Sequence, residues 1–255
     1  MTDPTRKTAL AVGILYLLTF IGSIPGALLM APVLTNPNYI AGPGAATQIG
    51  IAAVFEMVNV LALIGCAVAA FSIVKRQHEG LALGYVATRS FEAAVIVIGV
   101  VSILAVSSLQ QTAAAGADAA AFVPVGIALV DVRHWAMVIG PSMAAFNALM
   151  FGTLLYRSGL VPRAIPALGL VGAPLMISWA VGAMIGVTEP NTLWHGIAVF
   201  PYFFWELAVG LWLTFKGFNR SAPIVVAAMA EAGQSTSPSY PSPSPVTIAT
   251  KAGAA

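Results

Sequence analysis

Residues 81–107 read LALGYVATRSFEAAVIVIGVVSILAVS, a run long enough to cross a bilayer as a single helix. Two ionisable side chains, Arg89 and Glu92, interrupt this run one helical turn apart. An ionisable group at the bilayer centre costs about 2.5–3.5 kcal/mol on insertion scales, so such groups usually face a protein interior or a wet cavity. The stretch therefore predicts a membrane helix whose polar face is turned toward other membrane helices.

The remaining sequence has the composition of a membrane protein. It is 59% hydrophobic and 8% charged, against about 25% charged residues in soluble domains. Apolar runs long enough to span a bilayer cover residues 8–30, 49–74, 81–107, 133–156, 163–186 and 194–216. We predict an all-α, polytopic bundle of six transmembrane helices over residues 1–218. An Ala/Ser/Pro-rich cytoplasmic tail, predicted to be disordered, follows over residues 219–255.

The positions of the basic residues predict the orientation of these spans. Nine of the 11 Lys and Arg residues lie at the N-terminus, in the second and fourth loops or in the tail: Arg6, Lys7, Lys75, Arg76, Arg157, Arg163, Lys216, Arg220 and Lys251. The positive-inside rule places all of them in the cytoplasm, so both termini are expected there, in a multi-pass protein of the inner (plasma) membrane. Arg133 is the exception, and we interpret it as a residue at the outer mouth of the fourth span.

Two local features concern the ends of spans. Arg6 and Lys7 precede an apolar run, as in a secretory signal peptide, but the run over residues 8–30 is too long for one and predicts the first span. Asp118, within the third loop, has the character of a helix N-cap and predicts a short surface helix that leads into the fourth span. The single cysteine, Cys66, lies in an apolar run and excludes a disulfide framework.

Polar side chains in other spans recur at helical spacing and at similar depths. We predict that they converge with Arg89 on a buried polar centre, whose members are Glu56, Asn59, Tyr85, Arg89, Glu92, Asn147, Tyr202 and Glu206. One arginine cannot neutralise three glutamates in an apolar interior. At least one of the three carboxyl groups is therefore expected to carry a proton at neutral pH.

Two functions fit a centre of this kind. Carboxyl groups that take up and release a proton beside a permanently charged arginine suit a site that binds or translocates a proton or a small solute. The same cluster could instead be a clasp that fixes helix packing in a structural or accessory membrane subunit. The expected partners are the lipid bilayer and such a ligand, together with further copies of the chain through small-residue faces such as Gly22 and Gly26. A net charge of +2 spread over loops does not suggest a nucleic-acid partner.

A third hypothesis, an intramembrane metal-dependent hydrolase, rests on Asp131, His134 and His195 near the outer surface. Their spacing lacks the His pair at i and i+4 that is typical of a metal site, and neighbouring tryptophans favour the role of interfacial anchors. The chain has no phosphate-binding loop and no nucleophile motif, which argues against an enzyme. We expect no cofactor.

Several short stretches also carry a family resemblance. They are residues 6–9 (RKTA), 15–20 (LYLLTF), 81–85 (LALGY), 154–163 (LLYRSGLVPR), 205–207 (WEL) and 216–218 (KGF), together with Arg89 and Glu92. With them the chain resembles the domain of unknown function 4386 family of bacterial membrane proteins, over about residues 6–218. The resemblance implies a six-helix integral membrane fold and supplies no activity, substrate or catalytic residue.

Overall fold

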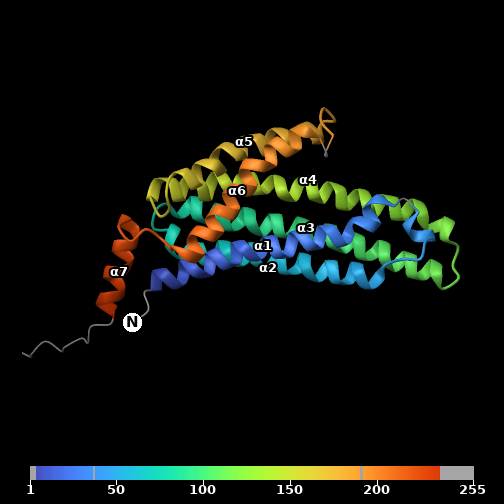
Figure 1. The fold of residues 1–255 in the computed structure, drawn as a ribbon, viewed down its shortest axis with the longest axis horizontal. Helices are drawn as coiled ribbons and strands as arrows, with labels where there is room; N and C mark the ends of the chain where they lie inside the picture. The colour runs from blue at the N-terminus through green and yellow to red at the C-terminus, as the bar shows by residue number, and fades with distance from the viewer. Residues whose placement is uncertain (1–3, 37, 190–191, 236–255) are drawn as a thin grey trace, which may run out of the picture.

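A computed structural model describes residues 4–36, 38–189 and 192–235, in which all regular structure is helical. Its elements, in chain order (Figure 1), are α1 (Pro4–Thr35), the 3₁₀ helix η1 (Tyr39–Ala41), α2 (Ala46–Val74), α3 (Glu79–Ala114), α4 (Ala119–Ser158), α5 (Ala164–Met184), α6 (Leu193–Phe215) and α7 (Pro223–Ser235). Within the described residues, six helices, α1 to α6, are long and apolar enough to cross a membrane. The predicted all-α fold with six such helices is confirmed.

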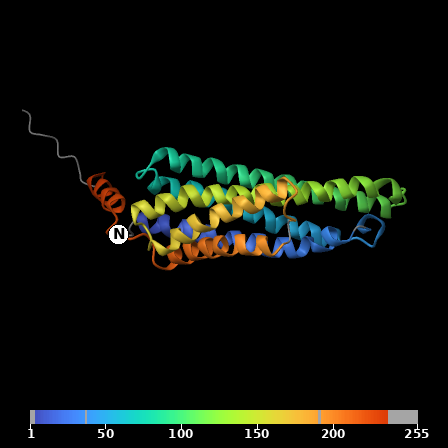
Figure 2. The same cartoon turned by 90° about the horizontal axis from the view of Figure 1, so that it is seen from above.

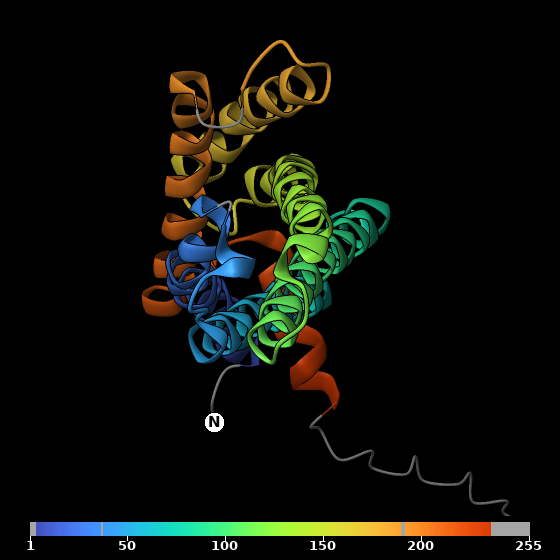
Figure 3. The same ribbon diagram turned by 90° about the vertical axis from the view of Figure 1, so that its right-hand side faces the viewer.

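The six long helices form a closed ring. Each packs against the next helix in the chain, and α6 returns to pack against α1, as the view along the bundle in Figure 3 shows. Aromatic side chains fill the middle of the ring. Phe151 of α4 stacks on Tyr85 at 4.6 Å between ring centroids and meets Tyr16 and Trp205 at 6.1 Å each. The interior at this level is therefore built from stacked aromatic rings, and the hydroxyl groups of Tyr16 and Tyr85 can bond to polar neighbours.

Close helix contacts use the small residues noted in the sequence. A Cβ atom added to Gly22 of α1 would lie 2.5 Å from the backbone nitrogen of Asn59, and one added to Gly26 would lie 2.9 Å from Cγ of Glu56. Only glycine lets α1 and α2 approach so closely, because any side chain would overlap the facing helix. Gly22 and Gly26 thus serve packing inside the chain, and oligomerisation through small-residue faces stays a prediction.

The third and fourth spans are longer than predicted. No separate surface helix precedes the fourth span, because α4 runs without a break from Ala119, and Asp118 caps it by accepting a hydrogen bond from the Ala120 N–H at 3.0 Å. The 36 residues of α3 would extend about 54 Å, nearly twice the roughly 30 Å thickness of the hydrocarbon core. Figures 1 and 2 show α3 and α4 continuing well beyond the level where α5 and α6 end. Packing of α4 against α3 and η1 keeps this extension helical.

The predicted disorder of residues 219–255 is wrong for residues 223–235, which form helix α7. This helix lies across the end of the bundle (Figure 1). Val225 is fully buried in the main hydrophobic core, and Arg76 donates two hydrogen bonds, of 2.8 and 2.9 Å, to the carboxylate of Glu231. Tertiary contacts thus order a segment that composition alone predicts to be disordered. The Ser/Pro-rich residues 236–255 lie outside the described part of the chain.

Candidate functional site

Arg89 of α3 is the hub of a buried ion-pair cluster, which we call the Arg89 centre and define as Arg89, Glu92, Glu206 and their hydrogen-bonding partners. Its Nη1 donates to Oε2 of Glu92 at 3.0 Å, and its Nη2 forms a short ion pair with Oε1 of Glu206. The same Nη2 lies 3.3 Å from the Tyr16 hydroxyl. The guanidinium also lies over the rings of Tyr16 and Tyr85, at 5.4 and 5.9 Å from their centroids. Arg89 is only 1% exposed, so this arginine is neutralised entirely from within the protein.

Each carboxylate of the centre has a further donor from another helix. Asn147 of α4 donates its Nδ2 to Oε2 of Glu92 at 2.7 Å, and the Tyr202 hydroxyl donates to Oε1 of Glu206 at 2.5 Å. Thr88 in turn bonds the Oδ1 atom of Asn147. The spacing of Arg89 and Glu92 at i and i+3, and of Tyr202 and Glu206 at i and i+4, places each pair on one helix face. Side chains of α1, α3, α4 and α6 therefore meet in one hydrogen-bonded network.

A line of hydroxyl and thiol groups leads from the Arg89 centre toward the end of the bundle where α3 begins. The Tyr16 hydroxyl lies 2.8 Å from that of Tyr85, which lies 3.6 Å from Sγ of Cys66. Cys66 also donates to the backbone carbonyl of Leu63 at 3.1 Å. Tyr16 was not among the predicted members of the site. A signal for it existed, because it carries a hydroxyl in the middle of the first apolar run, but nothing local tied it to Arg89.

Glu56 does not join the Arg89 centre, and this corrects the prediction of a single cluster. Its Oε1 accepts a hydrogen bond of 2.7 Å from Nη2 of Arg133, and both side chains are almost completely buried. Arg133 does not lie at the start of its helix, because α4 begins 14 residues earlier, at Ala119, and its side chain is turned inward to Glu56. Asn59, one turn from Glu56, is buried against Gly22 of α1.

The two ion-pair clusters differ in their balance of charge. Arg133 faces one carboxylate, so that pair is neutral when both groups are ionised. Arg89 faces two, and full ionisation would leave an excess negative charge buried among apolar side chains. An arginine stays charged in proteins, so the Arg89 centre is neutral only when one of its two carboxyl groups carries a proton, and that protonation stays a prediction. The predicted excess of carboxylates over arginines therefore concerns Glu92 and Glu206, and no longer Glu56.

The three candidate metal ligands are not assembled. Asp131 and His134 lie on α4, where His134 meets the edge of the Trp135 ring, whereas His195 of α6 stacks on Trp179 of α5 at 4.2 Å between centroids. Among the residues that the structure describes, no three His, Cys, Asp or Glu side chains come close enough to hold a metal ion. The geometry therefore does not support the metal-dependent hydrolase.

Fold and site together define a class: a multi-pass helical membrane protein with two separate ion-pair clusters inside one ring of helices. Residues 11–217 match the sequence model of a protein family described as domain of unknown function (DUF4386). The chain belongs to this family. The resemblance seen in the sequence is thereby confirmed. No curated protein and no solved structure gives a significant match to the chain.

Proposed function

We propose that the protein binds or moves a proton, or a small solute coupled to one, at the Arg89 centre. The observation that carries this proposal is the meeting of two buried carboxylates at a single guanidinium, through Glu92 and Glu206. Two carboxyl groups beside one permanently charged guanidinium are neutral as a set when one of them is protonated, so the site is suited to taking up and releasing one proton. A buried titratable group in a membrane helix is by default a functional candidate, because burying it costs free energy that an apolar side chain at the same position would not cost.

The depth of the centre supports the same proposal. Glu206 lies near the middle of α6, 13 residues from its start and nine from its end. The hydroxyl groups of Tyr16 and Tyr85 and the thiol of Cys66 continue from there toward the end of the bundle where α3 begins. We call this the basic end, because Lys75 and Arg76 lie there, between α2 and α3. We assign the protein to the inner membrane. By the positive-inside rule, its basic end then faces the cytoplasm, and both termini lie on that side. The line stays buried as far as Cys66, so a path to the cytoplasmic side would need an opening of the helices beyond this thiol.

A structural role is the second candidate, and the near-complete burial of Arg89 favours it. In that case the centre is a clasp of an accessory membrane subunit, tying four helices together. Removal of one partner would lower stability because an unpaired charge stays buried, and no transport would exist to lose.

Reconstituted vesicles separate the two candidates. Wild-type protein and the Glu92→Gln and Glu206→Gln variants are placed in vesicles that contain a pH-sensitive dye, and proton flux is measured after a pH step. Glu56→Gln is the matched control, since it removes one buried carboxylate from the neutral pair with Arg133. We expect the two variants of the centre to lose most of the flux and the control to keep it. Equal flux in all four well-folded proteins would sink the proposal.

A further inference from the structure

An open groove of about 450 Å³ runs between α3 and α4 on the outside of the bundle. Its walls are apolar along their whole length, apart from one carboxylate, that of Asp131. Phe91, at 53% exposed, and Trp135, at 42% exposed, stand on opposite walls. The volume lies within the roughly 300–1,000 Å³ of ordinary ligand sites, and the walls match an aliphatic chain.

The length and position of the groove correspond to one leaflet. Along α4 it reaches from Ile139 to Ala128, about 16 Å at 1.5 Å per residue, which is close to half of the roughly 30 Å hydrocarbon core. Its inner end is marked by Phe91, the neighbour of Glu92 in the Arg89 centre. By the same rise, Asp131 lies about 12 Å from Ile139, toward the outer end of the groove, so its carboxylate can reach the level of the lipid headgroups.

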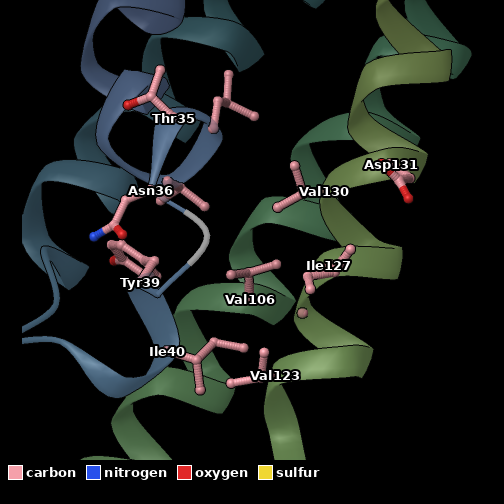
Figure 4. Close-up of a pocket in the computed structure, with 12 residues that line it drawn as sticks. Thr35, Asn36, Tyr39, Ile40, Val106, Val123, Ile127, Val130 and Asp131 are labelled. Atoms are coloured by element: carbon pink, nitrogen blue, oxygen red, sulfur yellow. The ribbon is translucent and has the colours of Figure 1, made fainter.

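Asp131 has no cationic partner within the described part of the chain. It takes part in none of the ion pairs there, and the closest arginine in sequence, Arg133, is turned inward to Glu56. A smaller hollow of about 170 Å³ on the other flank of α4 also borders on Asp131. Figure 4 shows that Asp131 lies on the side of α4 away from Thr35 and Asn36, which edge that hollow. An exposed carboxylate at headgroup depth beside an apolar groove is complementary to a cation that carries an acyl chain.

We propose that the α3–α4 groove binds one phospholipid whose headgroup carries a primary ammonium group. An acyl chain fills the groove, and Asp131 binds the ammonium. The lipid belongs to the leaflet opposite the basic end of the bundle. This site is separate from the Arg89 centre and does not depend on the function proposed for it.

The test is retention of lipid by the full-length protein. Protein is exchanged into nanodiscs with equal amounts of phosphatidylethanolamine and phosphatidylglycerol of the same acyl chains, and the lipids that stay bound on extraction are counted by native mass spectrometry. Asp131→Asn removes the charge, and Ala128→Trp fills the groove without changing the charge. Glu189→Gln removes an exposed carboxylate elsewhere, and Leu61→Trp places the same large side chain at an exposed position on α2.

Wild type is expected to retain phosphatidylethanolamine in preference to phosphatidylglycerol. Asp131→Asn should lower that preference about threefold, the scale of a partly exposed ion pair. Ala128→Trp should lower retention of both lipids, and the two controls should behave as wild type. Equal retention of the two lipids by wild type would overturn the proposal, as would full retention in Asp131→Asn and Ala128→Trp. A doubled protein mass without bound lipid would also overturn the proposal, because it would mean that a second copy of the chain covers the groove.

Discussion

Arg133 and Glu56, 77 positions apart in the chain, form a buried ion pair with 2.7 Å between Nη2 and Oε1. The pair lies inside the same ring of helices as Arg89, which faces two carboxylates instead of one. Its neutrality makes it a natural internal comparison for the Arg89 centre. A buried arginine with one carboxylate partner can be purely structural, whereas two ionised carboxylates at Arg89 would leave one negative charge in excess.

The Arg133–Glu56 pair should behave as a clasp that can be replaced by apolar side chains. We expect Arg133→Met to lower the free energy of unfolding by about 3–5 kcal/mol, because Glu56 is left as an unpaired buried charge. The double variant Arg133→Met with Glu56→Met should recover most of that loss. Unfolding in detergent, followed by tryptophan fluorescence, measures both effects. A double variant as unstable as the single one would show that the pair does more than fix packing.

Arg89 depends on the forked shape of its guanidinium as well as on its charge. Lysine keeps the charge but cannot reach Glu92, Glu206 and Tyr16 from two separate nitrogens. We expect Arg89→Lys to cost about 1.5–3 kcal/mol of stability, the worth of one hydrogen bond to a charged group. Arg157→Lys, at an exposed arginine, should change stability by less than about 0.5 kcal/mol in the same assay. A loss of the same size in both variants would contradict this account of Arg89.

Gly22 tests the close approach of α1 and α2. A methyl group there meets the Asn59 backbone at 2.5 Å, so Gly22→Ala should destabilise the protein by about 1–3 kcal/mol through overpacking. The matched control is Gly50→Ala in α2, where a methyl group meets nothing within 4 Å and should stabilise the helix by about 0.5–1 kcal/mol. Thermal unfolding of both variants decides the point, and a neutral Gly22→Ala would mean that α1 and α2 lie further apart.

The docking of α7 should depend on pH through Glu231. Hydrogen bonds from Arg76 lower the pKa of this carboxyl. A lowered pKa in the folded state means that its contribution is fully present above the ordinary glutamate pKa of about 4.3 and is lost as the pH falls through the lower, folded-state value. We expect the ion pair to hold α7 most firmly from neutral pH down to about pH 5 and to lose its small contribution below about pH 4, because an exposed pair is screened by solvent.

A dye attached at Met229→Cys, in a Cys66→Ala background, reports this motion by its fluorescence anisotropy, since Met229 is 41% exposed. Glu231→Gln is the control and should show the same low-pH anisotropy at every pH, because the ion pair is absent throughout. Anisotropy equal to wild type in Glu231→Gln would show that the packing of Val225, and not the ion pair, holds α7.

Part of the candidate site could be read from the sequence because helical spacing acts within one element. Arg89 with Glu92, and Tyr202 with Glu206, share a helix face by spacing alone, and their depth in the spans predicts that they are buried. The assignment of Glu56 to the same cluster failed for a different reason. Which arginine a glutamate meets depends on which helices are neighbours and how each is rotated, and neither quantity is local in the chain.

The sequence by itself determined the six apolar helices, because a span follows from the local hydropathy of about 20 residues. It also determined that polar groups would be buried among them. Only the tertiary structure decided that Arg133 neutralises Glu56 and that Arg89 holds Glu92 and Glu206 together. The same holds for α7, whose few apolar side chains become ordered only against a surface that other helices provide. Ion pairs and docked helices arise between elements far apart in the chain, and closing the ring of helices is what brings them together.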